Sequence, residues 1–267
     1  MECLGLGSSG PQVTMLQQQL RQRGFDPGEV TGRFGPGTDA ALRLFQHIVG
    51  LPVDGLAGPN AIAALNIPSV TSNITLNQVL PMFPGTPRVN TQFHLPFVLK
   101  ALLDAELADK SMVLMAFGTI RAEAAAFQPV EETLSPFNTS PGGHPFDKYD
   151  NRRDLGNLGP PDGARFKGRG FVQLTGRANY RQFSKALGLG QSLLDDPARA
   201  NDPDIAAKVL AAFLKDKEDS IRRALQAGDM ALARRLVNGG NHGLRDFEDA
   251  FQRGQALVPD DVRVETA

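Results

Sequence analysis

Val30-Thr-Gly-Arg-Phe-Gly-Pro-Gly-Thr-Asp-Ala-Ala-Leu42 is repeated, with changes, as Val53-Asp-Gly-Leu-Ala-Gly-Pro-Asn-Ala-Ile-Ala-Ala-Leu65. Each copy contains a glycine turn, a Gly-Pro pair and then apolar residues at helical spacing. Glycine readily adopts positive φ, and proline is tolerated in the first turn of a helix. Before the first copy, Val13, Leu16 and Leu20 follow the helical spacing and Gly24 ends it. The pattern predicts a small bundle of about three helices over residues 4–66.

The composition of the whole chain indicates a folded protein. It has 267 residues, 41% of them hydrophobic, with 28 Lys plus Arg against 29 Asp plus Glu. This length predicts one large domain or two modest ones. The balanced charge argues against a protein that coats nucleic acid, because such proteins are clearly basic. The single cysteine, Cys3, excludes an intramolecular disulfide framework and a cysteine-rich zinc site.

The remainder of the chain is predicted to be mainly helical. Residues 67–73 are small and polar and are expected to link residues 1–66 to a second domain over 74–267. Thr75 to Gln78 fits a capping box, and residues 90–96 and much of 135–170 are expected to be loops. No run of alternating apolar residues indicates strands. Helices are predicted over 97–107, 111–127 with Ser111 as N-cap, 177–187, 202–227, 229–237 and 243–257.

Three glutamates are candidates for acid–base chemistry. Glu123 lies among apolar residues of the predicted helix 111–127, and such a setting raises the pKa of a carboxyl group by desolvation. Glu131 and Glu132 follow shortly after that helix. A pair of carboxyl groups, one acid and one base, is the usual equipment for cleaving a glycosidic bond. A solvated or ion-paired glutamate is the simpler interpretation for each residue considered alone.

Residues 4–66 resemble the peptidoglycan-binding domain found on many bacterial and phage cell-wall hydrolases. The matching residues are Gly10, Val13, Leu16-Gln17, Leu20, Gly24, Gly32 to Thr38, Leu42, Phe45-Gln46 and Gly50 to Gly55. Most of these residues build turns and core, so wall binding is implied by the resemblance. Bacterial peptidoglycan is therefore the expected partner.

Residues 74–257 resemble glycoside hydrolase family 19, whose chitinase-like, lysozyme-like helical fold is also used by phage endolysins. The resemblance rests on Arg152 to Asn157, on Asp162 to Gly170 running into Phe171-Val-Gln-Leu-Thr-Gly-Arg-Ala-Asn-Tyr180, and on Val237-Asn-Gly-Gly-Asn-His-Gly-Leu244. It implies a larger helical catalytic domain with a long loop region. It also implies a modular wall hydrolase that needs no cofactor and binds no metal.

The resemblance assigns roles to individual residues. Glu123 falls at the proton donor, Glu132 at the presumed general base, and Thr175 at the hydroxyl that positions the attacking water. The expected mechanism is inversion, which requires about 6.5–9.5 Å between the two carboxyl groups. Residues expected to bind substrate are Gln173, Asn179, Tyr180, Asn238 and Arg169, the last of which is also suited to orienting a carboxylate through its guanidinium.

The sequence departs from the family pattern in three ways. Ala122 replaces the usual histidine before the acid, and Ala124 to Ala126 replace the usual glycines after it. The chain also has no tryptophan and only two tyrosines, Tyr149 and Tyr180, although sugars often stack on such rings. The absence of tryptophan weakens the case for chitin more than the case for peptidoglycan. A chitinase and a non-catalytic wall-binding protein remain alternatives.

A metallopeptidase is the alternative from another class of enzyme. His47, His94, His144 and His242 form no H-E-x-x-H motif, and only His144 with Asp147 or Asp150 has ligand-like spacing. Each histidine is expected at the surface or in a loop. Apart from Phe166, Phe171 and Tyr180, no stacking aromatics are interleaved with the basic cluster between Arg152 and Arg181. Because the chain is also nearly neutral overall, we expect no nucleic-acid partner.

The sequence also suggests where the protein acts. No run approaches the roughly 18 apolar residues that span a bilayer, so no membrane insertion is expected. The N-terminus has no basic residue followed by an apolar core, so no signal peptide is expected. We expect a monomer that is made in the bacterial host cytoplasm and reaches the wall or periplasm after release or export.

Overall fold

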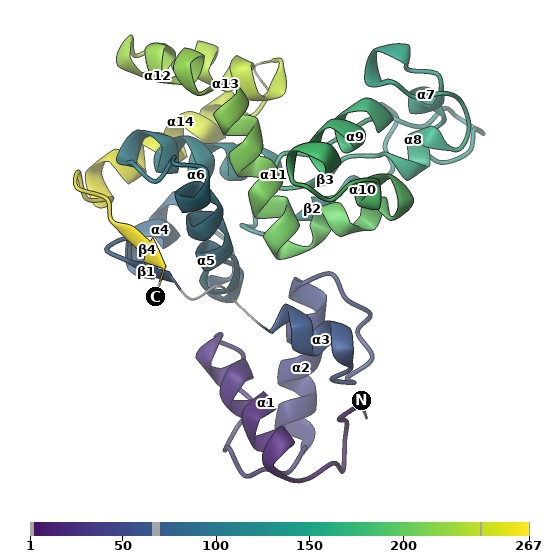
Figure 1. The fold of residues 1–267 in the computed structure, drawn as a ribbon, viewed down its shortest axis with the longest axis vertical. Coiled ribbons are helices and arrows are strands. Elements are labelled where there is room, and N and C mark those ends of the chain that lie inside the picture. The colour runs from purple at the N-terminus through teal and green to yellow at the C-terminus, as the bar shows by residue number, and fades with distance from the viewer. Residues whose placement is uncertain (1–2, 66–69, 241, 267) are drawn as a thin grey trace.

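The computed structural model describes residues 3–65, 70–240 and 242–266. We call residues 3–65 the N-terminal region and residues 70–266 the C-terminal region. Figure 1 shows the N-terminal region as a compact group of helices below the larger C-terminal region. Its helices are α1 (Pro11–Gln22), α2 (Pro36–Ile48) and α3 (Pro59–Ala64). The bundle of three helices predicted from the repeat is confirmed.

Buried glutamines hold the turns of the repeat. Gly32 and Gly55 have φ of 69° and 71°, a conformation that favours glycine. The Gly32 N–H donates to Gln17 Oε1 at 3.0 Å, and the Gly55 N–H donates to Gln46 Oε1 at 2.9 Å. Pro36 and Pro59 then begin α2 and α3. The two copies therefore share a turn-to-glutamine hydrogen bond as well as a sequence pattern.

The C-terminal region is mainly helical, as predicted. Its longer helices are α5 (Arg88–Asp104), α6 (Lys110–Ala124), α9 (Arg177–Ala186), α11 (Pro203–Asp216), α12 (Glu218–Gln226), α13 (Met230–Asn238) and α14 (Leu244–Leu257). Its short helical turns are α4 (Leu76–Val79), η1 (Leu80–Met82), α7 (Asp147–Asp150), η2 (Arg153–Leu155), α8 (Asp162–Arg165), α10 (Ser192–Asp195) and η3 (Pro197–Asn201). Among the described residues, no helix is long and apolar enough to cross a membrane.

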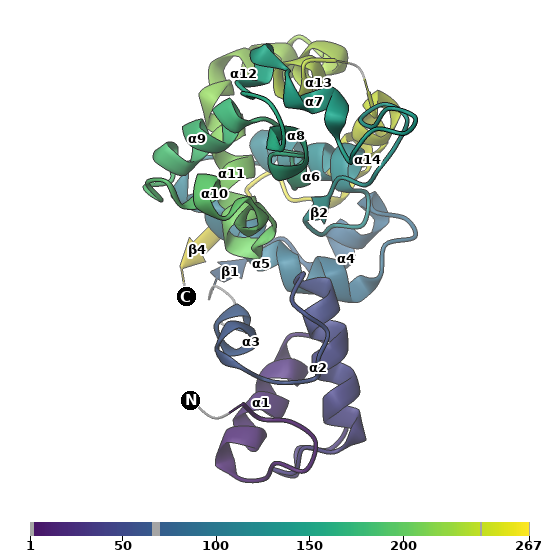
Figure 2. The same ribbon diagram turned by 90° about the vertical axis from the view of Figure 1, so that its right-hand side faces the viewer.

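Helix α6 lies at the centre of the C-terminal region. Its residues from Met112 to Phe117 and Ile120 have no exposed surface, because α11, α12 and α14 pack around it (Figure 2). Asp109 caps its first turn by accepting from the Met112 N–H at 3.2 Å, so the prediction of Ser111 as N-cap is wrong. The helix ends at Ala124, where Ala125 has φ of 37°. Glu123 is therefore fixed at the end of a buried helix.

The prediction of a loop over residues 90–96 is wrong, because these residues belong to α5. Pro96 lies inside this helix. His94 is fully buried, contrary to the surface or loop position expected for it. Its Nδ1 lies 2.9 Å from the Asn90 carbonyl oxygen, and its ring packs edge-on against Phe93 and Phe171. Desolvation lowers the pKa of His94 to about 4. Aromatic packing, which the local pattern did not indicate, stabilises this helix.

Helix α5 also joins the two regions. The Phe93 ring meets Phe45 of α2 at 5.5 Å and Phe25 at 5.8 Å between ring centroids. All three rings have no exposed surface. The hydrophobic core therefore continues from the N-terminal region into the C-terminal region.

Part of the expected linker forms a strand. Strand β1 (Val70–Ser72) pairs antiparallel with β4 (Val264–Thr266), close to the other end of the chain. Residues 67–69 of the expected linker lie outside the described residues. A second two-stranded sheet pairs β2 (Val130–Glu131) with β3 (Arg169–Gly170) and brings the segment after α6 beside the glycine-rich segment.

Candidate active site

Glu123 is held by an arginine from another helix. Arg234 of α13 donates from Nη2 to Glu123 Oε1 at 2.5 Å, and its Nε donates to the His242 carbonyl oxygen at 3.0 Å. The Glu123 side chain is 12% exposed, whereas the Arg234 side chain is fully buried. The apolar spacing around Glu123 did not indicate this ionic partner. The structure thus places Glu123 at the surface of the core with its orientation fixed.

The segment after Glu123 is fastened to α5 and the turn before it. Thr86 donates from its hydroxyl to the Ala125 carbonyl oxygen at 2.9 Å. Asn90 donates from Nδ2 to the Ala126 carbonyl oxygen at 2.9 Å and to Gln128 Oε1 at 3.0 Å. The segment with alanines in place of the family's glycines is therefore held by side chains from another element. No local pattern in the sequence indicated these contacts.

Glu132 accepts three hydrogen bonds. The Asn138 side-chain amide and the Tyr149 hydroxyl each donate to its Oε1 at 2.9 Å, and the Gly168 N–H donates to its Oε2 at 3.0 Å. A carboxylate that only accepts has the pattern of the ionised form. Desolvation, followed by the hydrogen bond to Glu132, raises the pKa of Tyr149 to about 12, so its hydroxyl remains a donor at neutral pH. Sequence reasoning missed Asn138 and Tyr149, which lie in the long loop.

Gly168 marks the place where Glu132, Gln173 and Thr175 meet. A Cβ atom at Gly168 would lie 2.6 Å from Gln173 Oε1 and 3.2 Å from both Glu132 Oε2 and Thr175 Oγ1. The lack of a side chain at this position lets the three polar groups approach one another. The Thr175 hydroxyl donates to the Gln173 carbonyl oxygen at 2.8 Å, so its lone pairs remain able to accept from a water. Gln173 is itself anchored because its Nε2 donates to the Val130 carbonyl oxygen at 3.0 Å.

A cavity of about 370 Å³ brings half of the predicted site residues together. Glu123, Gln173, Thr175 and Asn179 line it. Asn179 donates from Nδ2 to the Thr175 carbonyl oxygen at 2.7 Å, which orients its side-chain amide beside the cavity. Sequence reasoning missed Phe213, which also lines the cavity and stacks on Phe183 with 4.5 Å between ring centroids.

Arg169 and Tyr180 form a network of polar contacts with Glu131 and Lys167. Arg169 pairs with Glu131 at 2.8 Å, and its Nη1 donates to the Tyr180 hydroxyl at 3.0 Å. Tyr180 has no exposed surface and donates to the Lys167 carbonyl oxygen at 2.8 Å. The expectation that Tyr180 contacts substrate is wrong, because its ring is sealed in the core. Asn238 ends α13, but its side chain lies outside the described part of the structure.

The histidines are dispersed over the fold. His144 Nε2 lies 2.9 Å from Asp150 Oδ2, whereas Asp147 Oδ1 accepts from the Ser140 N–H at 2.7 Å. His47 is exposed on α2 and His242 is exposed just before α14. Across residues 3–65, 70–240 and 242–266, no group of three or more His, Cys, Asp or Glu side chains is arranged to hold a metal ion.

Comparison with known proteins shows that the N-terminal region is similar to a described domain family. Residues 9–65 match the family described as "Putative peptidoglycan binding domain". The spore cortex-lytic enzyme of Bacillus cereus is 58% identical over 52 residues, which cover 20% of each chain. The zinc D-Ala-D-Ala carboxypeptidase of Streptomyces albus G is 46% identical over 61 residues, covering 21% of this chain and 23% of that protein. The chain thus spans only about a fifth of the length of the curated relatives that it matches.

Among solved structures, chitinase C from Streptomyces griseus HUT6037 is similar to this chain. The alignment covers 69% of this chain and 76% of that one, with 22% identity and a TM-score of 0.49.

Proposed function

We propose that this protein is a peptidoglycan hydrolase of the endolysin type, which cleaves β-1,4-glycosidic bonds of the bacterial wall glycan. The observation that supports this most strongly is the arrangement around one cavity. Glu123 and Thr175 line the cavity together, and the Glu132 carboxylate lies beside Thr175 at Gly168. A carboxyl acid, a carboxylate base and a group that holds water form the set that glycoside hydrolysis requires.

In the proposed mechanism, Glu123 gives its proton to the oxygen of the leaving sugar as the glycosidic bond breaks. Arg234 then stabilises the carboxylate that remains on Glu123. A water held by the Thr175 hydroxyl attacks the sugar carbon, and Glu132 takes the proton that this water loses. The Asn138 and Tyr149 donors keep the Glu132 carboxylate in one orientation throughout. The product has inverted configuration, because the water attacks opposite the leaving group in a single displacement.

The N-terminal region supports the wall as the substrate in preference to chitin, because residues 9–65 match a peptidoglycan-binding family. That match does not choose the bond that is cut, since the matched relatives include proteins named as a lytic enzyme and as a carboxypeptidase. The carboxylate arrangement supports the glycan over the peptide. We further propose that the protein acts as a monomer, binds no nucleic acid, and reaches the wall from the bacterial cytoplasm by release or export.

The experiment that tests the proposal is the substitution Glu123→Gln. Glutamine keeps an oxygen for Arg234 but has no proton to give, so digestion of purified sacculi should fall about 10²- to 10⁴-fold, the range expected for losing a general acid. The melting temperature should change little. The matched control is Glu106→Gln, which alters an exposed carboxylate outside the cavity lining and should leave activity intact. Normal digestion by Glu123→Gln would refute the assignment of the acid.

A further inference from the structure

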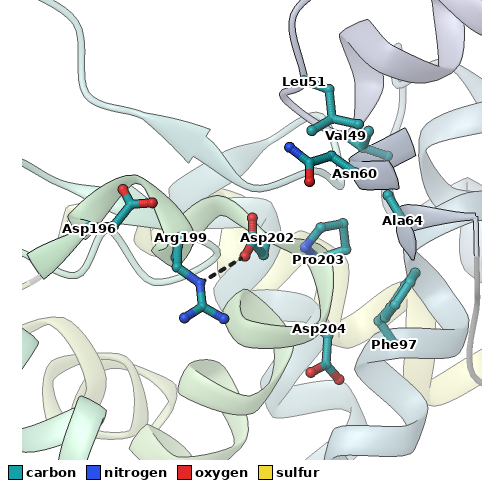
Figure 3. Close-up of a pocket in the computed structure, with 10 residues that line it drawn as sticks. All are labelled: Val49, Leu51, Asn60, Ala64, Phe97, Asp196, Arg199, Asp202, Pro203 and Asp204. Carbon is teal, nitrogen blue, oxygen red and sulfur yellow. Dashed lines mark ion pairs between the residues drawn. The ribbon is translucent and has the colours of Figure 1, made fainter. Parts of the chain in front are cut away.

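A second and larger cavity lies between the two regions of the molecule. Its volume is about 630 Å³, within the range of small-molecule binding sites. We call it the inter-region cleft. One wall is apolar and is formed by Val49, Leu51, Ala64 and Phe97, which come from both regions (Figure 3).

The opposite wall of the cleft is rich in carboxylates. It is formed by Asp196, Arg199, Asp202 and Asp204, and Asn60 of α3 projects into the space between the walls (Figure 3). Arg199 pairs with Asp202 at 3.6 Å, and Asp204 pairs with Lys208 at 2.7 Å. Within the described part of the chain, the exposed Asp196 carboxylate has no ion-pair partner. The wall therefore offers mainly hydrogen-bond acceptors.

These features define the chemistry of a ligand. Asp202 and Asp204 lie at the N-terminal end of α11 and offset its positive dipole, so the cleft disfavours an anion. The ligand must supply donors to the carboxylates and an apolar surface to the opposite wall. An uncharged N-acetylated amino sugar has both, because its hydroxyl and amide N–H groups donate while its acetyl methyl and ring C–H groups are apolar.

The cleft is continuous with the surface of the N-terminal region. Leu51 and Asn60 line the cleft and also line a cavity of about 330 Å³ within the N-terminal region, beside Gln46 and Asp54. That region is the one that matches a peptidoglycan-binding family. The cleft thus extends a surface for which a wall ligand is already indicated.

Helix α11 connects the cleft to the catalytic cavity. Pro203 at its first turn lines the cleft, and Phe213 near its last turn lines the catalytic cavity. Ten residues of helix separate them by about 15 Å along the axis. We propose that the inter-region cleft is a second, non-catalytic site for N-acetylated sugars of the glycan strand. This inference rests on the proposed glycan substrate.

Binding in the inter-region cleft would keep the glycan strand on the protein between cleavage events. A strand held in the cleft keeps neighbouring sugars at a high effective concentration near the catalytic cavity without taking part in the reaction. Both regions are needed, because Asn60 belongs to the N-terminal region and Asp196 to the C-terminal region.

The test is calorimetric titration of the full-length Glu123→Gln protein with a hexamer of N-acetylglucosamine. Two binding events are expected. Asp196→Ala and Asn60→Ala should each weaken one event about tenfold, as expected for losing a hydrogen bond to a desolvated ligand. The other event should not change. The matched control is Asp195→Ala, which removes a neighbouring exposed carboxylate that does not line the cleft.

Equal binding curves for the Asp196→Ala and Asp195→Ala proteins would overturn the inference. So would binding of a free wall peptide that Asp196→Ala abolishes while the sugar titration is unaffected, because the cleft would then be a peptide site. The proposed function fails separately, if wild-type protein releases no reducing ends from sacculi, and that result does not depend on Asp196.

Discussion

The N-terminal region and the cavity lined by Glu123, which we propose to be catalytic, both contain a glycine N–H that donates to a side chain, but the acceptors differ in chemistry. In the N-terminal region, the Gly32 and Gly55 N–H groups donate to neutral side-chain amides of Gln17 and Gln46, which are 1% and 2% exposed. Beside the catalytic cavity, the Gly168 N–H donates to the carboxylate of Glu132. The buried, neutral amides of Gln17 and Gln46 each hold a turn in place. In the proposed mechanism, the carboxylate of Glu132 takes a proton from water, which a neutral amide acceptor does not do.

The largest effect on stability is expected from protonation of His94, which lies in α5, the helix that contacts both regions. His94 is neutral when folded, because its pKa is lowered to about 4 from an ordinary 6.5. Between these two values the unfolded chain binds a proton that the folded chain does not. The stability from a neutral His94 is therefore complete above pH 6.5 and is lost as the pH falls, by about 3 kcal/mol at pH 4.

Chemical unfolding of wild type and His94→Leu across pH 4–7 checks this prediction. The free energy of unfolding of wild type should fall more steeply on acidification than that of the variant, by about 1.4 kcal/mol per pH unit between pH 4 and 6.5. The two regions should unfold together, because Phe25, Phe45 and Phe93 share one core. If the free energy of unfolding changed with pH in the same way for both proteins, the protonation of His94 would not contribute to stability.

A smaller effect is expected from a turn of the N-terminal region. Gln17→Ala leaves the Gly32 N–H without its acceptor and removes the donor to Thr38, so it should lower stability by about 1–3 kcal/mol. Hydrolysis of soluble glycan fragments should be unaffected. Gln18→Ala, at an exposed position on the same helix, is the control and should be nearly neutral. If Gln17→Ala instead lowered turnover and left stability unchanged, Gln17 would act in the reaction and not in holding the turn.

The smallest effect is expected at Thr175. Thr175→Val keeps the shape of the side chain but removes the hydroxyl that holds water, so turnover should fall about tenfold. Thr175→Ser retains a hydroxyl and should restore most of the rate. Steady-state kinetics on soluble glycan fragments measures both variants. Equal rates for the valine and serine variants would mean that the hydroxyl has no part in the reaction.

The sequence predicted those parts of the fold that depend on local patterns. The glycine turns and prolines of the repeat specified the N-terminal helices, and the resemblance brought Glu123, Gln173 and Thr175 forward as a set. The sequence pattern did not predict that α5 includes residues 90–96. Pro96 disfavours a helix locally, but burial of Phe93 and His94 outweighs this preference. The prediction of one helix over 202–227 was also too long, since α11 ends at Asp216 and α12 begins at Glu218.

The partners of the site were not predictable from local sequence. Arg234 lies far along the chain from Glu123, and the loop residues Asn138 and Tyr149 reach Glu132 only through tertiary folding. Tyr180 is expected to bind substrate because it belongs to a motif, yet its hydroxyl accepts from Arg169 and donates to the Lys167 carbonyl oxygen in the core. A motif thus indicated which residues gather near the site, while burial decided which of them can meet a ligand.

The central claim is that the paired carboxylates cut the glycan, and the bonds broken in purified sacculi test it most directly. Reducing ends and free amino groups should be counted after digestion by wild-type protein, with and without prolonged EDTA treatment. We predict new reducing ends, no new amino groups, and the same rate after EDTA. Release of amino groups by an activity that EDTA abolishes would contradict the account, because a peptidase that depends on metal-bound water would then be at work.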